Sequence, residues 1–256
     1  MELNRRTFLK ISGAAILGLA CKPVIDKLTG DGLVRASVAA DASAKSWAMI
    51  VDLNACKSKS GCTDCITACH SIHNVPDTGN PKDEIKWIWK SSYEGAFPGY
   101  DNEFVNANWK GKPAIVLCNH CQDAPCTKVC PTQATWKRED GIVMMDYHRC
   151  IGCRYCMAAC PYGSRSFNWQ DPRPFITNLD PGFAGRTKGV VEKCNFCEER
   201  LAIGRIPACV EACSEKALIF GNVNDPESEA GKILRSRYSI QRKPELGTKP
   251  RVYYLV

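Results

Sequence analysis

The stretch Cys150-Ile151-Gly152-Cys153-Arg154-Tyr155-Cys156-Met157-Ala158-Ala159-Cys160-Pro161 decides the fold. Its four cysteines are separated by two, two and three residues, and a proline follows the last one. Short Cys-x2-Cys loops let successive thiolates converge on one point while backbone N–H groups face the sulfurs. The spacing therefore predicts a metal site built from sulfur ligands.

Three further groups of cysteines vary this pattern. They are Cys56-x5-Cys62-x2-Cys65-x3-Cys69, Cys118-x2-Cys121-x4-Cys126-x3-Cys130-Pro131 and Cys194-x2-Cys197-x11-Cys209-x3-Cys213. Of the 17 cysteines, only Cys21 lies outside the four groups. With 256 residues, the chain is much longer than the domains of ~80 residues or fewer in which dense cysteines usually form disulfides. Metal ligation is therefore the favoured interpretation.

The third group has the same spacing as the bacterial iron–sulfur run Cys-x2-Cys-x2-Cys-x3-Cys-Pro. In two-cluster ferredoxins the fourth cysteine of this run binds the neighbouring cluster, so two runs interlock into one unit. Zinc is the main alternative, because Cys-x2-Cys pairs also bind zinc. Four quartets that all end in Cys-x3-Cys favour iron–sulfur clusters instead.

The composition is that of an ordinary globular chain, with 45% apolar and 24% charged residues, which excludes disordered and fibrous classes. The net charge of +7 counts the polypeptide without metal. Cysteines bind metal as thiolates, so the metal-bound protein is less positive. The charge therefore predicts no nucleic-acid partner.

The N-terminus has the layout of a twin-arginine export signal. Arg5 and Arg6 precede Thr7-Phe8-Leu9-Lys10 and an apolar stretch from Ile11 to Cys21, and small residues suited to a signal peptidase lie at 37–40. Residues 1–40 are interpreted as this signal, which predicts a protein on the periplasmic or extracytoplasmic face of the cytoplasmic membrane. The apolar stretch is shorter than the roughly 20 residues of a membrane span. No span is expected, apart from a retained signal acting as a tether. A basic amphipathic helix is the alternative.

Local patterns predict several strands. Residues 134–145 read as a hairpin around Asp140-Gly141, and residues 217–221 as another strand. Alternation places Ile85, Trp87 and Trp89 on one strand face. This aromatic-rich segment is interpreted as a packed insertion, with a partner-docking surface as the alternative. The final Val-Tyr-Tyr-Leu-Val is expected to form a strand on its own fold or on a partner.

Together the four groups resemble the four-cluster iron–sulfur subunits of membrane-bound oxidoreductases, a family that includes the electron-transfer subunits of formate dehydrogenase, polysulfide reductase and tetrathionate reductase. The resemblance runs from about Trp47 to Val223. It implies an α+β fold of two interlocked two-cluster ferredoxin-like units, with short β-hairpins and an aromatic-rich insertion. The expected segments are one unit at 47–75 with 188–223, the other at 113–170, the insertion at 76–112 and a C-terminal docking tail at 224–256.

The resemblance also implies four 4Fe-4S clusters, because in the family the first group pairs with the fourth and the second with the third. The first cluster would be held by Cys56, Cys62, Cys65 and Cys213, and the second by Cys69, Cys194, Cys197 and Cys209. The third would be held by Cys118, Cys121, Cys126 and Cys160, and the fourth by Cys130, Cys150, Cys153 and Cys156. The family usually has two residues between the first two cysteines of the first group, where this chain has five. Cys56 is therefore the least secure ligand, and its cluster is four-iron with a longer loop, three-iron or absent.

A closer resemblance lies in residues 141–156 and in Arg165-Ser166-Phe167-Asn168-Trp169. With the twin-arginine start, these look like the periplasmic iron–sulfur subunit of Dsr/Hme complexes in sulfur-based anaerobic respiration. This implies an electron relay between a multi-span quinone-interacting membrane subunit and a c-type cytochrome or other iron–sulfur subunits.

Three alternatives remain open. The first is the electron-transfer subunit of a molybdopterin reductase, such as polysulfide or tetrathionate reductase. The second is a free periplasmic carrier. The third is a catalytic subunit, for which the chain offers neither a Gly-x-Gly-x-x-Gly loop nor a Ser/His/Asp constellation. No catalysis is expected on this chain alone.

Overall fold

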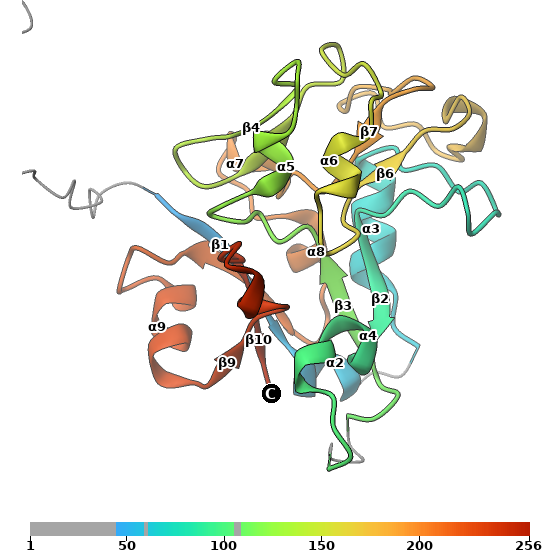
Figure 1. Ribbon diagram of the computed structural model, residues 1–256. Helices are drawn as coiled ribbons and strands as arrows, with labels where there is room; N and C mark the ends of the chain where they lie inside the picture. Colours follow the sequence, from blue (N-terminus) through green and yellow to red (C-terminus); the bar gives the residue numbers. More distant parts are fainter. Residues whose placement is uncertain (1–44, 59–60, 105–108) are drawn as a thin grey trace, which may run out of the picture. The chain divides into compact units, whose positions relative to one another are not determined.

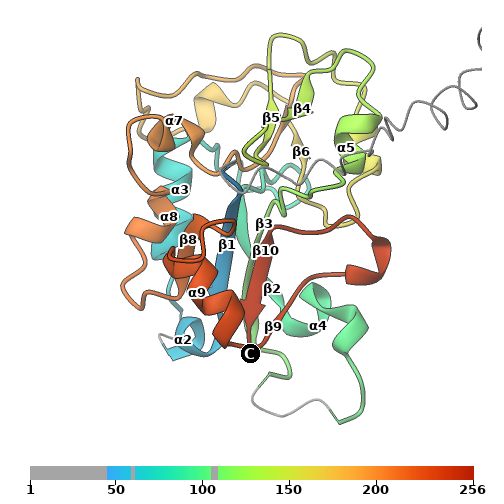
Figure 2. The same ribbon diagram turned by 90° about the vertical axis from the view of Figure 1, so that its left-hand side faces the viewer.

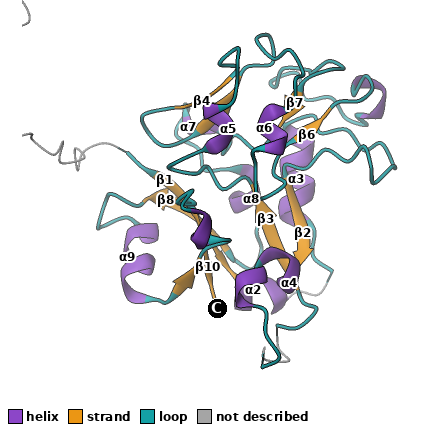
Figure 3. Ribbon diagram, in the orientation of Figure 1, coloured by secondary structure: helices purple, strands orange, loops and turns teal. Residues whose placement is uncertain are grey.

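The structure, a computed structural model, describes residues 45–58, 61–104 and 109–256. The signal interpreted at 1–40 lies outside these residues. Regular elements are short and are joined by long loops (Figure 3). Within the described ranges, no helix is long and apolar enough to cross a membrane.

The largest sheet has four strands in the order β8 (Leu218–Asn222), β1 (Trp47–Asp52), β10 (Val252–Leu255) and β9 (Ser239–Ile240). Strand β1 runs parallel to β10 and antiparallel to β8. The strand predicted at 217–221 is confirmed as β8, and its partner is β1. The C-terminal strand lies on its own fold.

Strand β1 is buried on both faces. Met49 and Val51 belong to the main apolar cluster, which also contains Cys65 and Cys209. Ile50 points to the opposite face and packs with Ala230 of helix α9 (Glu229–Ser236). Successive side chains of a strand point to opposite faces, so a strand covered on both faces needs apolar residues at successive positions. This explains the continuous apolar run of β1.

A second, two-stranded sheet pairs β2 (Ile88–Ser92) antiparallel with β3 (Pro113–Leu117). The expectation of a strand already at Ile85 is wrong, because β2 begins at Ile88. Trp87 is nevertheless fully buried. Its indole N–H donates to Glu192 Oε2 at 3.0 Å, and its ring stacks on His73. Tertiary contacts, rather than sheet alternation, therefore bury this residue.

The hairpin predicted around Asp140-Gly141 is confirmed as β4 (Thr135–Lys137) and β5 (Val143–Met145), and β6 (Ser166–Phe167) pairs with β7 (Val191–Glu192). Figures 1 and 2 show β4 and β6 grouped with helix α5 (Pro125–Lys128), away from the four-stranded sheet, and Figure 1 shows β7 and helix α6 (Tyr155–Ala158) in the same group. The other helices are α2 (Leu53–Ser58), α3 (Asp64–Ile72), α4 (Tyr93–Ala96), α7 (Glu198–Leu201) and α8 (Ala208–Glu211), with 3-10 turns at η1 (Pro98–Tyr100), η2 (Arg173–Phe175) and η3 (Pro244–Leu246).

Candidate metal centres

The four cysteine groups share a local backbone conformation. In each, the third cysteine is the second residue of a helix: Cys65 in α3, Cys126 in α5, Cys156 in α6 and Cys209 in α8. The residue before the second cysteine is left-handed in every group: Gly61 (φ 75°), His120 (φ 40°), Gly152 (φ 69°) and Phe196 (φ 59°). A left-handed residue turns the chain sharply, so each group brings a tight loop up to the start of a short helix.

The last cysteine of three groups is followed by a common turn. The residue three positions later is left-handed and its N–H donates to the carbonyl of that cysteine: Gln133 to Cys130 (3.3 Å), Gly163 to Cys160 (3.4 Å) and Lys216 to Cys213 (3.1 Å). The first group departs from this pattern, because α3 continues past Cys69 to Ile72. Cys69 therefore stays inside its helix, whereas the other three leave theirs.

Cysteines of the second and third groups line two cavities. One, with an empty volume of about 320 Å³, is lined by Cys118, Cys121, Cys126 and Cys160, here called the third site. The other, of about 270 Å³, is lined by Cys130, Cys150, Cys153 and Cys156, the fourth site. Each site takes three cysteines from one group and one from the other. Helix α5 packs on α6, which brings the two groups together.

Cysteines of the first and fourth groups form two further sets. Burial, and then the charges of Cys56, Cys213 and Cys62, raise the pKa of Cys65 to about 12. These four residues are here called the first site. Burial, and then Cys209, Cys194 and Cys197, raise the pKa of Cys69 well above its usual value. Those four residues are here called the second site.

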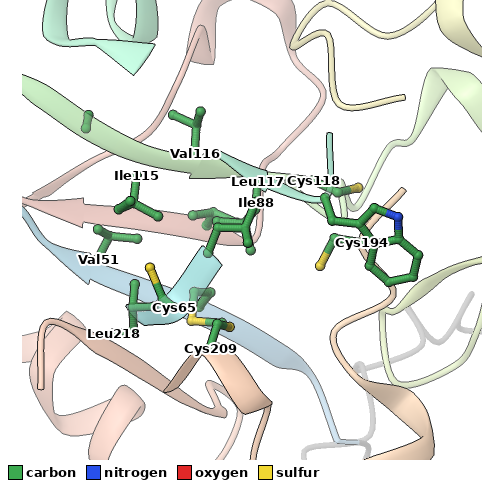
Figure 4. Packing of buried hydrophobic residues seen from close by; sticks show 14 of the residues in the cluster. Val51, Cys65, Ile88, Ile115, Val116, Leu117, Cys118, Cys194, Cys209 and Leu218 are labelled. Atoms are coloured by element: carbon green, nitrogen blue, oxygen red, sulfur yellow. The ribbon is translucent and has the colours of Figure 1, made fainter. Parts of the chain in front are cut away.

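The first and second sites meet where helix α3 packs on α8. Helix α3 carries Cys65 and Cys69, so it serves both sites. Figure 4 shows Cys65 beside Cys209 of α8, among the apolar side chains of Val51 and Leu218. The two sites therefore lie against the main apolar cluster.

The donor set fits iron–sulfur clusters. All 16 described cysteines are free of disulfides, and each site offers four sulfurs. Thiolates crowded in an apolar core repel one another and lose hydration, so they need bound cations to remain charged. Each site is accordingly suited to a cluster ligated by four cysteines, a group that supplies one-electron transfer.

The four sites form a row. The first and second sites share α3. Among the neighbouring charges, Cys118 has the largest effect on the pKa of Cys194, which links the second site to the third. Figure 4 shows these two sulfurs at the same end of the cluster. Arg165 is the neighbouring charge that acts most strongly on Cys156, followed by Cys126, and both link the third site to the fourth. Cys153 is exposed, and the first site keeps partly exposed cysteines, so both ends of the row reach the surface.

Two buried cations beside these sites were not found from the sequence. The Arg165 guanidinium donates to Cys126 Sγ at 3.0 Å and to Thr135 Oγ1 at 2.7 Å. The Lys193 ammonium donates to the carbonyl of Cys194 at 2.6 Å and to that of Val143. Cysteine spacing carries no information on such residues. The available signals were the position of Lys193 next to Cys194 and the place of Arg165 in the stretch 165–169 that carries the family resemblance.

Buried histidines near the sites act in packing and hydrogen bonding. His120 stacks on Phe196 with ring centroids 3.7 Å apart, and its Nδ1 accepts from the Val143 N–H at 3.0 Å. His73 lies 2.8 Å from the Cys69 carbonyl through Nδ1 and 2.9 Å from Glu199 Oε1 through Nε2. His73, Glu199 and Cys197 place possible ligand atoms within 4.8 Å of one another, but Cys197 already belongs to the second site.

The chain is similar in sequence to known iron–sulfur proteins. Residues 109–173, which hold the second and third cysteine groups, match the family model of the 4Fe-4S dicluster domain. The Hdr-like menaquinol oxidoreductase iron–sulfur subunit 1 of Archaeoglobus fulgidus is 41% identical over 98% of this chain and 97% of its own length. The chain belongs to the family of iron–sulfur subunits of oxidoreductases.

Other members of this family have similar identity. The menaquinone reductase iron–sulfur cluster-binding subunit of Nitratidesulfovibrio vulgaris is 37% identical, covering 82% of this chain and 88% of its own. The arsenate respiratory reductase iron–sulfur subunit of Shewanella sp. is 36% identical, covering 81% and 94%. Membership of this iron–sulfur subunit family identifies the chain as an iron–sulfur protein of electron transfer.

Two glycines with the same backbone conformation provide a test of the fourth site. A Cβ on Gly152 (φ 69°) would lie 2.4 Å from the Gly189 carbonyl oxygen, whereas one on Gly163 (φ 64°) would meet nothing within 4 Å. Both alanine variants carry the left-handed cost of about 1–2 kcal/mol. We expect Gly152→Ala alone to lose about four irons per chain, because its loop must move. Iron and labile-sulfide analysis checks this, and equal iron in the two variants contradicts it.

Proposed function

We propose that this chain conducts electrons through four 4Fe-4S clusters held at the first to fourth sites. The observation that carries the proposal is the row of four cysteine sets, accessible at both ends and enclosed in the middle. The contacts of α3 with α8 and of α5 with α6 support two interlocked two-cluster units, built from residues 47–75 with 188–223 and from 113–170.

The residues of the chain position the clusters and exclude water. Cys69, Cys194, Cys197 and Cys209 of the second site are all buried, as are three of the four cysteines of the third. Burial keeps the central sites away from solvent, which limits loss of electrons to soluble oxidants. Iron–sulfur potentials depend on cluster charge, hydrogen bonds to sulfur and exposure, so the protein sets them through the side chains around each site.

In this proposal Cys56 is a ligand of the first cluster. Cys56 lies in α2, and its pKa is raised by burial and then by Cys213 and Cys62. These influences support a complete four-cysteine first site despite the five residues between Cys56 and Cys62. The first cluster is accordingly proposed as a four-iron cluster with a longer loop.

The proposed setting is a respiratory complex of the Dsr/Hme type on the periplasmic face of the membrane. Relatives named as subunits of a menaquinol oxidoreductase and a menaquinone reductase support a quinone-interacting membrane partner. A c-type cytochrome or another iron–sulfur subunit would then exchange electrons at the other end of the row.

The alternative is the electron-transfer subunit of a molybdopterin reductase. It is supported by a relative named as a subunit of selenate reductase, 37% identical over 82% of this chain, and by the arsenate respiratory reductase relative. Sequence similarity does not separate the two settings, because the identities differ little.

Isolation of the native complex separates these settings. We expect the protein, extracted from membranes in mild detergent and purified anaerobically, to carry with it a multi-span quinone-interacting protein and a c-type cytochrome, identified by mass spectrometry. A large molybdopterin subunit in their place would establish the alternative. Purification of the chain alone, under conditions that keep other membrane complexes intact, would favour a free carrier.

Export is tested at the paired arginines. We expect Arg5→Lys combined with Arg6→Lys to hold the iron-loaded protein in the cytoplasm, because the twin-arginine route requires the arginine pair. Immunoblots of periplasmic, membrane and cytoplasmic fractions measure this. Exchange of Lys10 for Arg, which leaves the pair intact, is the control, and normal export of the double variant would contradict the proposal.

A further inference from the structure

Two buried cations lie beside the third site without a carboxylate partner. Arg165 is 5% exposed and Lys193 is 1% exposed. Within the described residues, neither forms an ion pair, whereas the equally buried Arg186 pairs with Glu192 at 2.7 Å. An unpaired buried charge is costly, so its presence next to a metal site calls for a compensating negative charge.

The sulfurs of the third site supply that charge for Arg165. One guanidinium nitrogen donates to Cys126 Sγ at 3.0 Å and to Thr135 Oγ1, and the other lies 3.8 Å from Met145 Sδ. Arg165 also lines the cavity of the third site. Its charge therefore faces the cysteines of the third site directly, and it also acts on Cys156 of the fourth site.

Lys193 adds a second positive charge between the second and third sites. Its ammonium donates to the carbonyl of Val143, a residue that lines the third cavity, and to the carbonyl of Cys194 in the second site. Cys118 of the third site lies beside Cys194 (Figure 4). The third site is thus flanked by a buried cation on each side.

Other sites have a different charge environment. Glu199 acts on Cys197 in the second site and is held there by His73 and Asn195. Cys56 in the first site lies near charges of both signs, Lys90, which is half-buried, and Asp52. The fourth site includes the exposed Cys153, so water screens charges there. Arg165 also acts on Cys156 of the fourth site, and Lys193 also acts on Cys194 of the second. Among the described residues, the third site is the one that borders both buried cations.

We propose that Arg165, assisted by Lys193, raises the reduction potential of the cluster at the third site and makes it the highest of the four. The inference rests on the proposed function. Reduction by an external one-electron donor adds one electron to the cluster, so the cluster with its thiolates becomes more negative by one elementary charge. A buried cation and an N–H donor to sulfur stabilise this more negative state. The third cluster is therefore the position in the row where an electron resides.

The test is a redox titration with dithionite, followed by electron paramagnetic resonance, on the full cluster-loaded protein and its Arg165→Gln variant. We expect the signal that is reduced at the highest potential in the wild type to be the one that shifts. Its reduced-to-oxidised ratio at a fixed potential should fall at least tenfold, which is about 59 mV for a one-electron couple. An unshifted titration, or a shift confined to a lower-potential signal, would overturn the proposal.

Matched variants separate charge from structural disturbance. Arg173→Gln makes the same change at an exposed arginine bound to Asp171, and no shift is expected. Thr135→Asp keeps Arg165 but replaces the hydroxyl to which Arg165 donates with a carboxylate. The reduction potential of the same signal is expected to fall. If Arg165→Gln loses iron, an unshifted Thr135→Asp protein with full iron would overturn the proposal.

Iron and sulfide analysis of the wild-type protein distinguishes failure of the proposed function from failure of the proposed role of Arg165. A wild-type protein without four clusters refutes the proposed function. A wild-type protein with four clusters, whose potentials do not respond to the loss of positive charge at Arg165, refutes only the role of this residue.

Discussion

Sulfur atoms crowded in an apolar core are the constraint on which this structure depends. Cys65, Cys69, Cys194 and Cys209 are part of the same buried cluster as the strands β1 and β3. As thiols they pack as small apolar side chains, but as thiolates they repel one another unless metal neutralises them. Cluster binding and folding are therefore coupled, as in other proteins whose metal ligands form part of the core.

This constraint explains why the chain around the sites has little regular secondary structure. The second and third groups each present three cysteines with a left-handed turn and one short helix, so the chain around these sites consists mostly of loops (Figure 3). The four-stranded sheet has a different role. Strand β1 leads into α2 and the first group, and β8 follows the fourth group, so their pairing holds these two groups together across about 170 residues of sequence.

Structural features that depend only on residues close in sequence could be predicted. The hairpin at Asp140-Gly141 and the strand at 217–221 were both predictable, because turn residues and alternation are local signals. The start of β2 was not, since the position of Trp87 depends on Glu192, 105 residues away. The parallel pairing of β1 with β10 likewise joins segments about 200 residues apart. Spacing alone also left open which cysteines share a site, because that depends on the packing of α3 on α8 and of α5 on α6. Arg165 opens one of the stretches that carry the family resemblance and Lys193 precedes Cys194, but only the folded chain shows that both are buried beside sulfur.

Electron conduction as proposed requires sixteen cysteines to hold four iron–sulfur clusters in one chain. The decisive measurement is quantification of iron, acid-labile sulfide and zinc per polypeptide on protein purified without oxygen. We expect about sixteen irons and about sixteen sulfides per chain with negligible zinc. Stoichiometric zinc without labile sulfide, or about eight irons in protein that retains its full fold, would contradict the four-cluster proposal.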